Sequence, residues 1–302
     1  MNIKLDELIY PVFVKRGEGL REEIPLMPGS FRLSPDVLLK EVKDLVDLEL
    51  KSFLIFGVPD EKTWHGTTAY NRNGIVTEAV KLLKSKLPDI TIFTDVCLCA
   101  YTSHGHCGIV KKGEEKIDLK ETLIALSEMA LAHAEAGADY VAPSAMAKGQ
   151  VDAIRKALDV CGYKNTKIMA YSAKFASNAY GPFRNVADSA PRFGDRRGYQ
   201  LDYSQKEEAL KRIEKDITEG ADIVMIKPAM WYLDMVNEVK NKIKHPLAVY
   251  NVSGEYAVVK EGAKLGLWEE KKIVNELLSS MKRSGADLII TYHAKDIARW
   301  LK

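Results

Sequence analysis

The sequence has 302 residues, of which 46% are hydrophobic, and its 44 basic and 42 acidic side chains give a net charge of +2. This near-balance argues against the basic field with which proteins bind nucleic acids or anionic membranes. No apolar run approaches the roughly 18 residues of a membrane span, and acidic residues interrupt the apolar N-terminal stretch, which argues against a signal peptide. We therefore expect a cytoplasmic globular protein with no nucleic-acid or membrane partner.

Eight short apolar runs, rich in β-branched residues, predict β-strands. The runs are continuous rather than alternating, which is typical of strands that helices cover. In chain order they occupy residues 11–14, 52–58, 91–98, 140–144, 167–172, 222–228, 247–252 and 287–293.

Segments with apolar residues at helical spacing separate these runs. They occupy residues 34–50, 76–87, 118–139, 151–160, 204–219, 233–244, 269–283 and 294–300. The alternation predicts an α/β protein with one domain over residues 1–302, a (β/α)8 TIM barrel in which residues 1–10 form a very short N-terminal arm. A doubly wound open sheet is the alternative, but no glycine-rich phosphate loop follows the first strand.

Two long loops, at residues 99–116 and 174–200, follow the third and fifth predicted strands. Both are rich in glycine, aromatic and polar residues. Active sites of (β/α)8 barrels are built from loops at the C-terminal ends of the strands. We therefore expect the active site at this end of the barrel and interpret residues 174–200 as its lid.

Two lysines stand at the ends of neighbouring predicted strands, Lys174 in SAKF and Lys227 in MIKP. Burial and a second cation nearby both lower the pKa of a lysine, and a neutral amine can attack a ketone to form an imine. The alternative is that each lysine reaches out of the barrel rim to solvent or pairs with an acid. The presence of both on adjacent strands favours Schiff-base chemistry.

Three cysteines lie close together in the sequence, at Cys97, Cys99 and Cys107. In a cytosolic protein this spacing indicates a metal rather than a disulfide. Three thiolate ligands leave a fourth position open, which is typical of catalytic zinc. Buried structural thiols are the alternative. Cys161 stands alone after a helix and is predicted to pack in the core.

The predicted lid contains arginines suited to binding a carboxylate through paired hydrogen bonds. Arg184 and Arg196, with Gln200, are the candidates, whereas Arg192 and Arg197 are expected to be solvated. Hydroxyl donors that could bind a second carboxylate stand at the ends of the last two strands. They are Tyr250, Ser253 and Tyr292.

Nearly the whole chain, from LIYPVFV to the C-terminus, resembles the porphobilinogen synthases, also called 5-aminolevulinate dehydratases. The most specific motifs are TDVCLCAYTSHGHCG, VAPSAM, MAYSAKFASNAYGPFR, GDRRGYQ, MIKPA, YNVSGEYA and TYHAKD. The resemblance implies a (β/α)8 barrel and a hydro-lyase of haem biosynthesis. Such an enzyme joins two molecules of 5-aminolevulinate in one active site and releases porphobilinogen and two waters.

The resemblance also implies roles for individual residues. Lys227 matches the lysine that holds the propionate-side substrate, and Lys174 the lysine that holds the acetate-side substrate. Cys97, Cys99 and Cys107 match the ligands of one zinc ion in zinc-dependent members. The remaining matches are Arg184, Arg196 and Gln200 for the acetate-side carboxylate, Ser253 and Tyr292 for the propionate-side carboxylate, and Asp95 and Ser144 near the reacting amines.

Four departures from the family pattern modify these expectations. Gly198 replaces a cysteine that holds a second zinc in some relatives, so we expect one zinc. Arg212 replaces a glutamate that organises an allosteric magnesium, so we expect none. Ala145 and Lys148 replace aspartates, with no effect that we can derive. The short N-terminal arm makes an octamer less expected than a hexamer or smaller homo-oligomer.

Two other functions deserve comparison. A class I aldolase would need one Schiff-base lysine and would leave the cysteines unexplained. A non-enzymatic zinc-stabilised binding module would need a closed site of four ligands, and only three are evident.

Overall fold

Eight parallel strands close into a barrel in the computed structural model, which describes residues 3–111, 113 and 115–302. β1 (Leu8–Lys15) pairs with both β4 (Ser52–Val58) and β10 (Leu288–Thr291), so the sheet closes on itself. The strands between β4 and β10 follow in chain order. They are β5 (Thr91–Val96), β6 (Tyr140–Pro143), β7 (Lys167–Lys174), β8 (Ile223–Lys227) and β9 (Leu247–Asn251). The predicted (β/α)8 barrel is confirmed.

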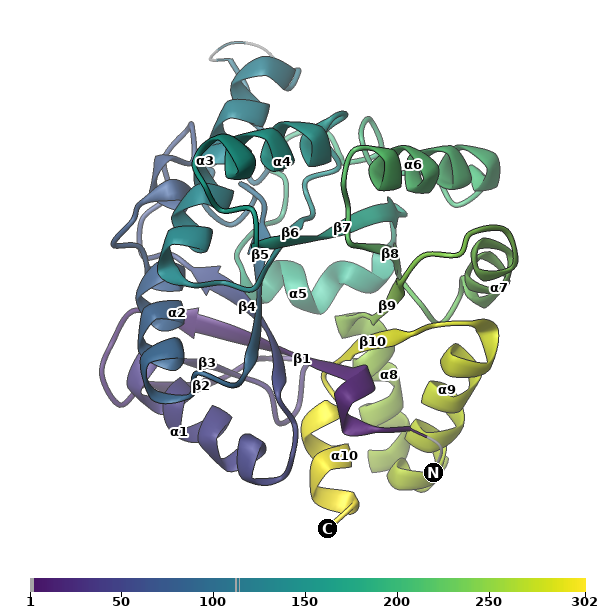
Figure 1. Ribbon diagram of the computed structural model, residues 1–302. Coiled ribbons are helices and arrows are strands. Elements are labelled where there is room, and N and C mark those ends of the chain that lie inside the picture. Colours follow the sequence, from purple (N-terminus) through teal and green to yellow (C-terminus); the bar gives the residue numbers. More distant parts are fainter. Residues whose placement is uncertain (1–2, 112, 114) are drawn as a thin grey trace.

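Helices surround the strands in a ring, and α5 is the exception because it lies in the centre of the view, framed by the strands (Figure 1). The surrounding helices are α1 (Pro35–Asp47), α2 (Ile75–Lys86), α3 (Leu119–Ala136), α4 (Gln150–Val160), α6 (Lys206–Thr218), α7 (Leu233–Lys242), α8 (Ser253–Lys264), α9 (Glu270–Ser284) and α10 (Ala294–Trp300). None of the described helices is long and apolar enough to cross a bilayer.

The core has two layers because successive strand residues point to opposite faces of the sheet. One set packs between the strands and the helices, and includes Val12, Ile55 and Val224. The other set fills the barrel interior, and includes Phe13, Phe56 and Met225. The interior layer is closed by aromatic side chains towards the C-terminal ends of the strands, where the candidate site lies.

Several predicted boundaries and placements were wrong. Lys174 is the last residue of β7 rather than part of the following loop, and Cys97 lies just beyond β5. Cys161 is exposed, not packed in the core, because α4 ends at Val160 and the chain turns at the surface. β1 begins at Leu8, three residues earlier than predicted. Residues 1–2 of the predicted arm lie outside the described residues.

Two strands and two helices were among the elements not predicted. A short hairpin of β2 (Arg21–Glu23) and β3 (Phe31–Leu33) extends the sheet beside β1. α8 begins at Ser253, directly after β9. Within the predicted lid, α5 (Gly181–Val186) gives the segment a helical turn of its own.

Candidate active site

The two lysines lie side by side at the C-terminal end of the barrel. Lys174 and Lys227 are register partners at the ends of β7 and β8, and each is only 6% exposed. The Nζ atom of Lys174 donates a hydrogen bond to the carbonyl oxygen of Ser144 at 2.6 Å. The Nζ atom of Lys227 lies 4.0 Å from the ring centroid of Tyr250. Both amines therefore face the barrel interior, not solvent.

Electrostatics favours a neutral amine on Lys227. Burial, and then the neighbouring charge of Lys174, lower the pKa of Lys227 to about 7. Neither lysine forms a salt bridge within the described residues, which argues against the alternative of a lysine paired with an acid. A buried primary amine that is partly neutral near pH 7 is suited to attack a carbonyl carbon.

Asp95 supplies a carboxylate beside the lysines. Burial raises its pKa to about 6, although a hydrogen bond from Ser144 and the charge of Lys174 oppose this rise. The Oδ1 atom of Asp95 has no hydrogen-bond partner among the described residues. A carboxyl group with this pKa can both accept and release a proton near neutral pH.

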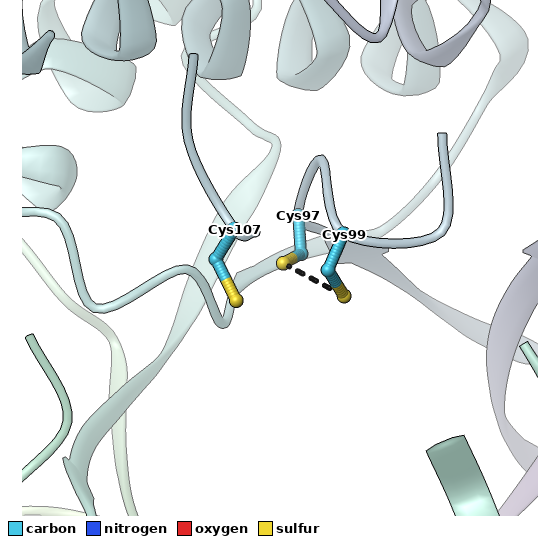
Figure 2. Close-up of side chains that lie close together, drawn as sticks. All are labelled: Cys97, Cys99 and Cys107. Carbon is cyan, nitrogen blue, oxygen red and sulfur yellow. Dashed lines mark hydrogen bonds between the residues drawn. The ribbon is translucent and has the colours of Figure 1, made fainter. Parts of the chain in front are cut away.

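The three cysteine thiols form a compact cluster at the end of β5 (Figure 2). The sulfur atoms of Cys97, Cys99 and Cys107 lie within 4.8 Å of one another, and those of Cys97 and Cys99 are 3.4 Å apart. Thiolates bound to one zinc at about 2.3 Å lie roughly 3.8 Å apart, so small side-chain rotations would accommodate the ion. All three cysteines are buried and free of disulfides. The cluster therefore fits a zinc ion.

The two nearby histidines do not complete this cluster. His106 uses both ring nitrogens, Nδ1 with the hydroxyl of Tyr199 at 3.2 Å and Nε2 with the carbonyl oxygen of Phe193 at 2.9 Å. The Nδ1 atom of His104 accepts a hydrogen bond from the backbone N–H of His106 at 3.1 Å. The Nε2 atom of His104 is buried and unpaired among the described residues, but the group of ligand atoms that lie within 4.8 Å of one another contains the three thiols and neither histidine.

Lid residues leave a set of buried polar atoms without partners. The Nε atoms of Arg184 and Arg196 and both side-chain polar atoms of Gln200 are buried and unpaired among the described residues. Arg196 is anchored by its Nη2 atom, which donates to the carbonyl oxygens of Gly105, at 2.9 Å, and Ser189. All three side chains line one cavity. Unpaired donors in a cavity are suited to an anionic ligand such as a carboxylate.

The predicted hydroxyl donors already have protein partners. The hydroxyls of Tyr250 and Tyr292 are 3.0 Å apart. The Oγ atom of Ser253 accepts a hydrogen bond from the backbone N–H of Phe183 at 3.1 Å and donates to the carbonyl oxygen of Ala179 at 3.4 Å. Ser253 therefore contacts two residues of the 174–200 segment.

The lid covers the barrel opening through an aromatic contact that the sequence analysis missed. The ring of Phe183, on α5, lies 5.7 Å from that of Phe13 and 5.1 Å from that of Phe56. Arg32 donates from Nε to the carbonyl oxygen of Val186 at 3.1 Å, and Lys62 forms an ion pair with Asp188 at 2.8 Å. No sequence signal distinguished Arg32 or Lys62.

The other two arginines of the 174–200 segment were expected to be solvated. As predicted, Arg192 and Arg197 are exposed.

A buried glutamate supports the site from behind and was also missed. The carboxylate of Glu255 accepts hydrogen bonds from the backbone N–H groups of Met230, at 2.6 Å, and Val252, at 2.8 Å. It thereby ties the loop after Lys227 to the start of α8, which carries Ser253. The available signal was the position of Glu255, three residues after the helix cap at Val252.

Comparisons with known proteins agree with this site. The model of the delta-aminolevulinic acid dehydratase family matches residues 1–300. The delta-aminolevulinic acid dehydratases of Archaeoglobus fulgidus and Methanothermus sociabilis are 50% and 53% identical, over 98% and 97% of this chain and 91% and 90% of theirs.

A solved structure has a closely similar fold. It is the crystal structure of delta-aminolevulinic acid dehydratase (porphobilinogen synthase) from Toxoplasma gondii ME49, in complex with the reaction product porphobilinogen. It superposes with a TM-score of 0.97 and 43% sequence identity, covering 99% of this chain and 85% of that one. With a family match over almost its full length and relatives at about half identity, this chain belongs to the delta-aminolevulinic acid dehydratase family.

Proposed function

We propose that this protein is a porphobilinogen synthase, a hydro-lyase that condenses two molecules of 5-aminolevulinate to porphobilinogen in haem biosynthesis. The observation that carries the proposal is the pair of buried amines, Lys174 and Lys227, at adjacent strand ends. One amine would suffice for an aldolase, whereas a condensation of two keto-amines uses both. Membership of the family and the product bound to the Toxoplasma gondii relative support the same reaction.

The chemistry balances with two lysine imines. Each lysine attacks the ketone of one substrate molecule and releases one water. The enamine carbon of one bound molecule then attacks the imine carbon of the other, which leaves that carbon bonded to its lysine as an amine. Loss of a proton from the attacking carbon expels this lysine and forms a carbon–carbon double bond. The amine nitrogen of the attacked molecule then adds to the remaining imine carbon and displaces the second lysine, and loss of a ring proton completes the pyrrole. Both lysines are regenerated, and two waters are lost in total. Asp95, with its pKa near 6, is placed to move protons during these steps.

Two carboxylate sites would each hold one substrate molecule beside its own lysine. Arg184, Arg196 and Gln200 would bind the carboxylate of the acetate-side substrate at Lys174, because each has at least one buried polar atom without a partner among the described residues. Ser253 and Tyr292, beside Tyr250, would bind the propionate-side carboxylate at Lys227. A carboxylate there must compete with the lid for Ser253, so substrate binding and lid position are coupled.

We also infer that Cys97, Cys99 and Cys107 hold one catalytic Zn²⁺ per subunit. The support is the mutual distance of the three buried thiols and the absence of a fourth ligand among the described residues around them. When bound, zinc would supply Lewis acidity to a substrate oxygen or amine. Hydrogen bonds with Cys97 and Cys99, and then the charges of Arg196 and Lys174, hold the pKa of Cys107 well below its usual value, which favours a thiolate ligand.

An allosteric magnesium is not expected at Arg212. Its Nε atom pairs with Glu208 at 3.1 Å, and its Nη1 atom donates to the carbonyl oxygen of Tyr199 at 3.0 Å. The guanidinium of Arg212 therefore already supplies a positive charge at this position.

We further propose that the protein is a homo-oligomer, since large apolar side chains such as Tyr203 and Trp231 are exposed beside the barrel opening. We propose the cytoplasm as its location.

A colorimetric assay for the pyrrole product tests the proposal directly. Purified protein supplied with zinc and 5-aminolevulinate should release porphobilinogen. If substrate is consumed without a pyrrole, or is bound without being consumed, the proposed reaction is wrong.

The pH dependence of the reaction should report the state of Lys227. The pKa of this amine is lowered to about 7, so the reactive neutral form increases as the pH rises through 7. We expect kcat/KM to fall below about pH 7 by up to tenfold per pH unit. Independently of catalysis, the rate at which an electrophile modifies Lys227 should show the same midpoint. In Lys174→Met this midpoint should move upward because a neighbouring cation is removed, and an unchanged midpoint would contradict the role of Lys174.

Removing one lid arginine should weaken substrate binding more than turnover. Arg184→Gln removes a charged donor, which contributes about 1.5–3 kcal/mol in a hydrogen bond to an ion, so KM should rise about 10–100-fold. Arg192→Gln is the matched control because this arginine of the same segment is exposed. Equal KM values for the two variants would contradict the assignment of Arg184 to the carboxylate.

A further inference from the structure

A second group of potential metal ligands lies where α8, α9 and α10 meet. Ligand atoms of Glu270, His293 and Asp296 all lie within 4.8 Å of one another. His293 caps the start of α10, and Asp296 follows three residues later, a spacing that places both side chains on one face of the helix. Glu270 is the first residue of α9. This group follows β10 and the cysteine cluster follows β5, so the two groups are separate in the fold.

His293 is the member that points to a ligand. The residue is 0% exposed, and neither ring nitrogen has a hydrogen-bond partner in the part of the chain that the structure describes. Buried polar atoms without partners are destabilising, so they are rare unless something else binds them. The ring packs against Tyr256 at a centroid distance of 4.5 Å, which holds it beside the two carboxylates.

A lysine now supplies the positive charge between the carboxylates. The Nζ atom of Lys260, on α8, forms ion pairs with Glu270 and, at 2.6 Å, with Asp296. One ammonium leaves a net charge of −1 on the two carboxylates and leaves the imidazole unused. The Lys260 side chain is long and flexible and remains 14% exposed, so its ammonium can move into solvent. The carboxylates of Glu270 and Asp296 are themselves partly exposed, which gives an ion access.

We propose that Glu270, His293 and Asp296 form a second metal site, which takes a divalent ion such as Mn²⁺ in exchange for the ammonium of Lys260. Two carboxylates and one imidazole suit Mn²⁺, Fe²⁺ or Zn²⁺ better than Ca²⁺ or Mg²⁺, which prefer oxygen ligands alone. The incoming ion neutralises both carboxylates, and Lys260 leaves with its proton. The site is non-catalytic, but it adjoins Tyr292 through Tyr256, whose ring lies 5.5 Å from that of Tyr292.

Binding of Mn²⁺ to the full-length protein tests the site, because Mn²⁺ prefers oxygen and nitrogen ligands over the thiolates of the cysteine cluster. Titration followed by electron paramagnetic resonance should show one bound Mn²⁺ per chain. Lys260→Met should bind Mn²⁺ at least about tenfold more tightly, because the competing ammonium is gone, and His293→Phe at least about tenfold more weakly. In Lys260→Met, Mn²⁺ should also raise the Tm by more than in the wild type.

Two controls keep the result specific. The Cys97/Cys99/Cys107→Ala variant should retain Mn²⁺ binding, because it leaves the second group intact. If His293→Phe does not fold, the titration is repeated with Glu270→Gln, which changes a half-buried ligand and should also weaken Mn²⁺ binding. The proposal is overturned if Mn²⁺ binds the ligand variants as tightly as the wild type. It is also overturned if Lys260→Met does not tighten binding.

Discussion

Borohydride reduction in the presence of 5-aminolevulinate should attach substrate covalently to Lys227, and Lys227→Met should lower kcat by at least about 10⁴-fold. The amine is the nucleophile, so its removal eliminates the covalent route rather than weakening a contact. Its position supports this expectation, because Lys227 is 6% exposed at the end of β8 and has a pKa lowered to about 7. Peptide mapping by mass spectrometry would locate the attached substrate.

The two lysines should give different results in this experiment. Lys174→Met should still trap one substrate molecule at Lys227 but release no porphobilinogen, because the second imine cannot form. Lys272→Met is the control, since Lys272 is a solvated lysine on α9. Trapped substrate at other lysines, with Lys227 unmodified under active conditions, would show that the proposed Schiff base is wrong.

Removal of zinc should have the second largest effect. The Cys97/Cys99/Cys107→Ala variant should contain no zinc at this site and should lose activity by roughly 10²-fold or more, as expected if a Lewis acid contributes about 3 kcal/mol or more. Chelation of the wild-type protein should cause a similar loss that added zinc reverses. Elemental analysis measures the zinc content, and the pyrrole assay measures the activity of the same sample.

The chain contains its own control for cysteine substitution. Cys161 is exposed and stands apart from the cluster, so Cys161→Ala should keep both the zinc and the rate. If the metal-free triple variant turns over at the wild-type rate, zinc has no part in catalysis. The thiols would then be structural, as the alternative interpretation of the sequence allowed.

Much of the barrel was predictable because its signals are local. A continuous apolar run predicts a covered strand wherever it lies in the chain, and helical spacing predicts the segments between. Parallel strands bring all their C-terminal ends to one face, so Lys174 and Lys227 could be expected to meet. The cysteine cluster followed from a spacing of a few residues. These inferences needed no knowledge of contacts between distant segments.

Other features depend on which distant segments meet. The short α5 lies inside a polar loop and is held by Phe13 and Phe56 of β1 and β4, whose strand positions carry no sign of this role. Cys161 was misplaced because the exposure of a residue after a helix depends on where the chain turns next. Glu255 was missed because α8 was not predicted, and only the fold showed that its carboxylate binds the loop after Lys227.

The sequence by itself determined the fold class, the meeting of Lys174 and Lys227 and the clustering of the three thiols, because each rests on periodicity, strand order or close spacing. Only the tertiary structure decided how residues 174–200 pack over the barrel, what Ser253 contacts and which acids surround His293. These arrangements depend on side chains far apart in the chain, and their energies come from burial and pairing that no local pattern encodes.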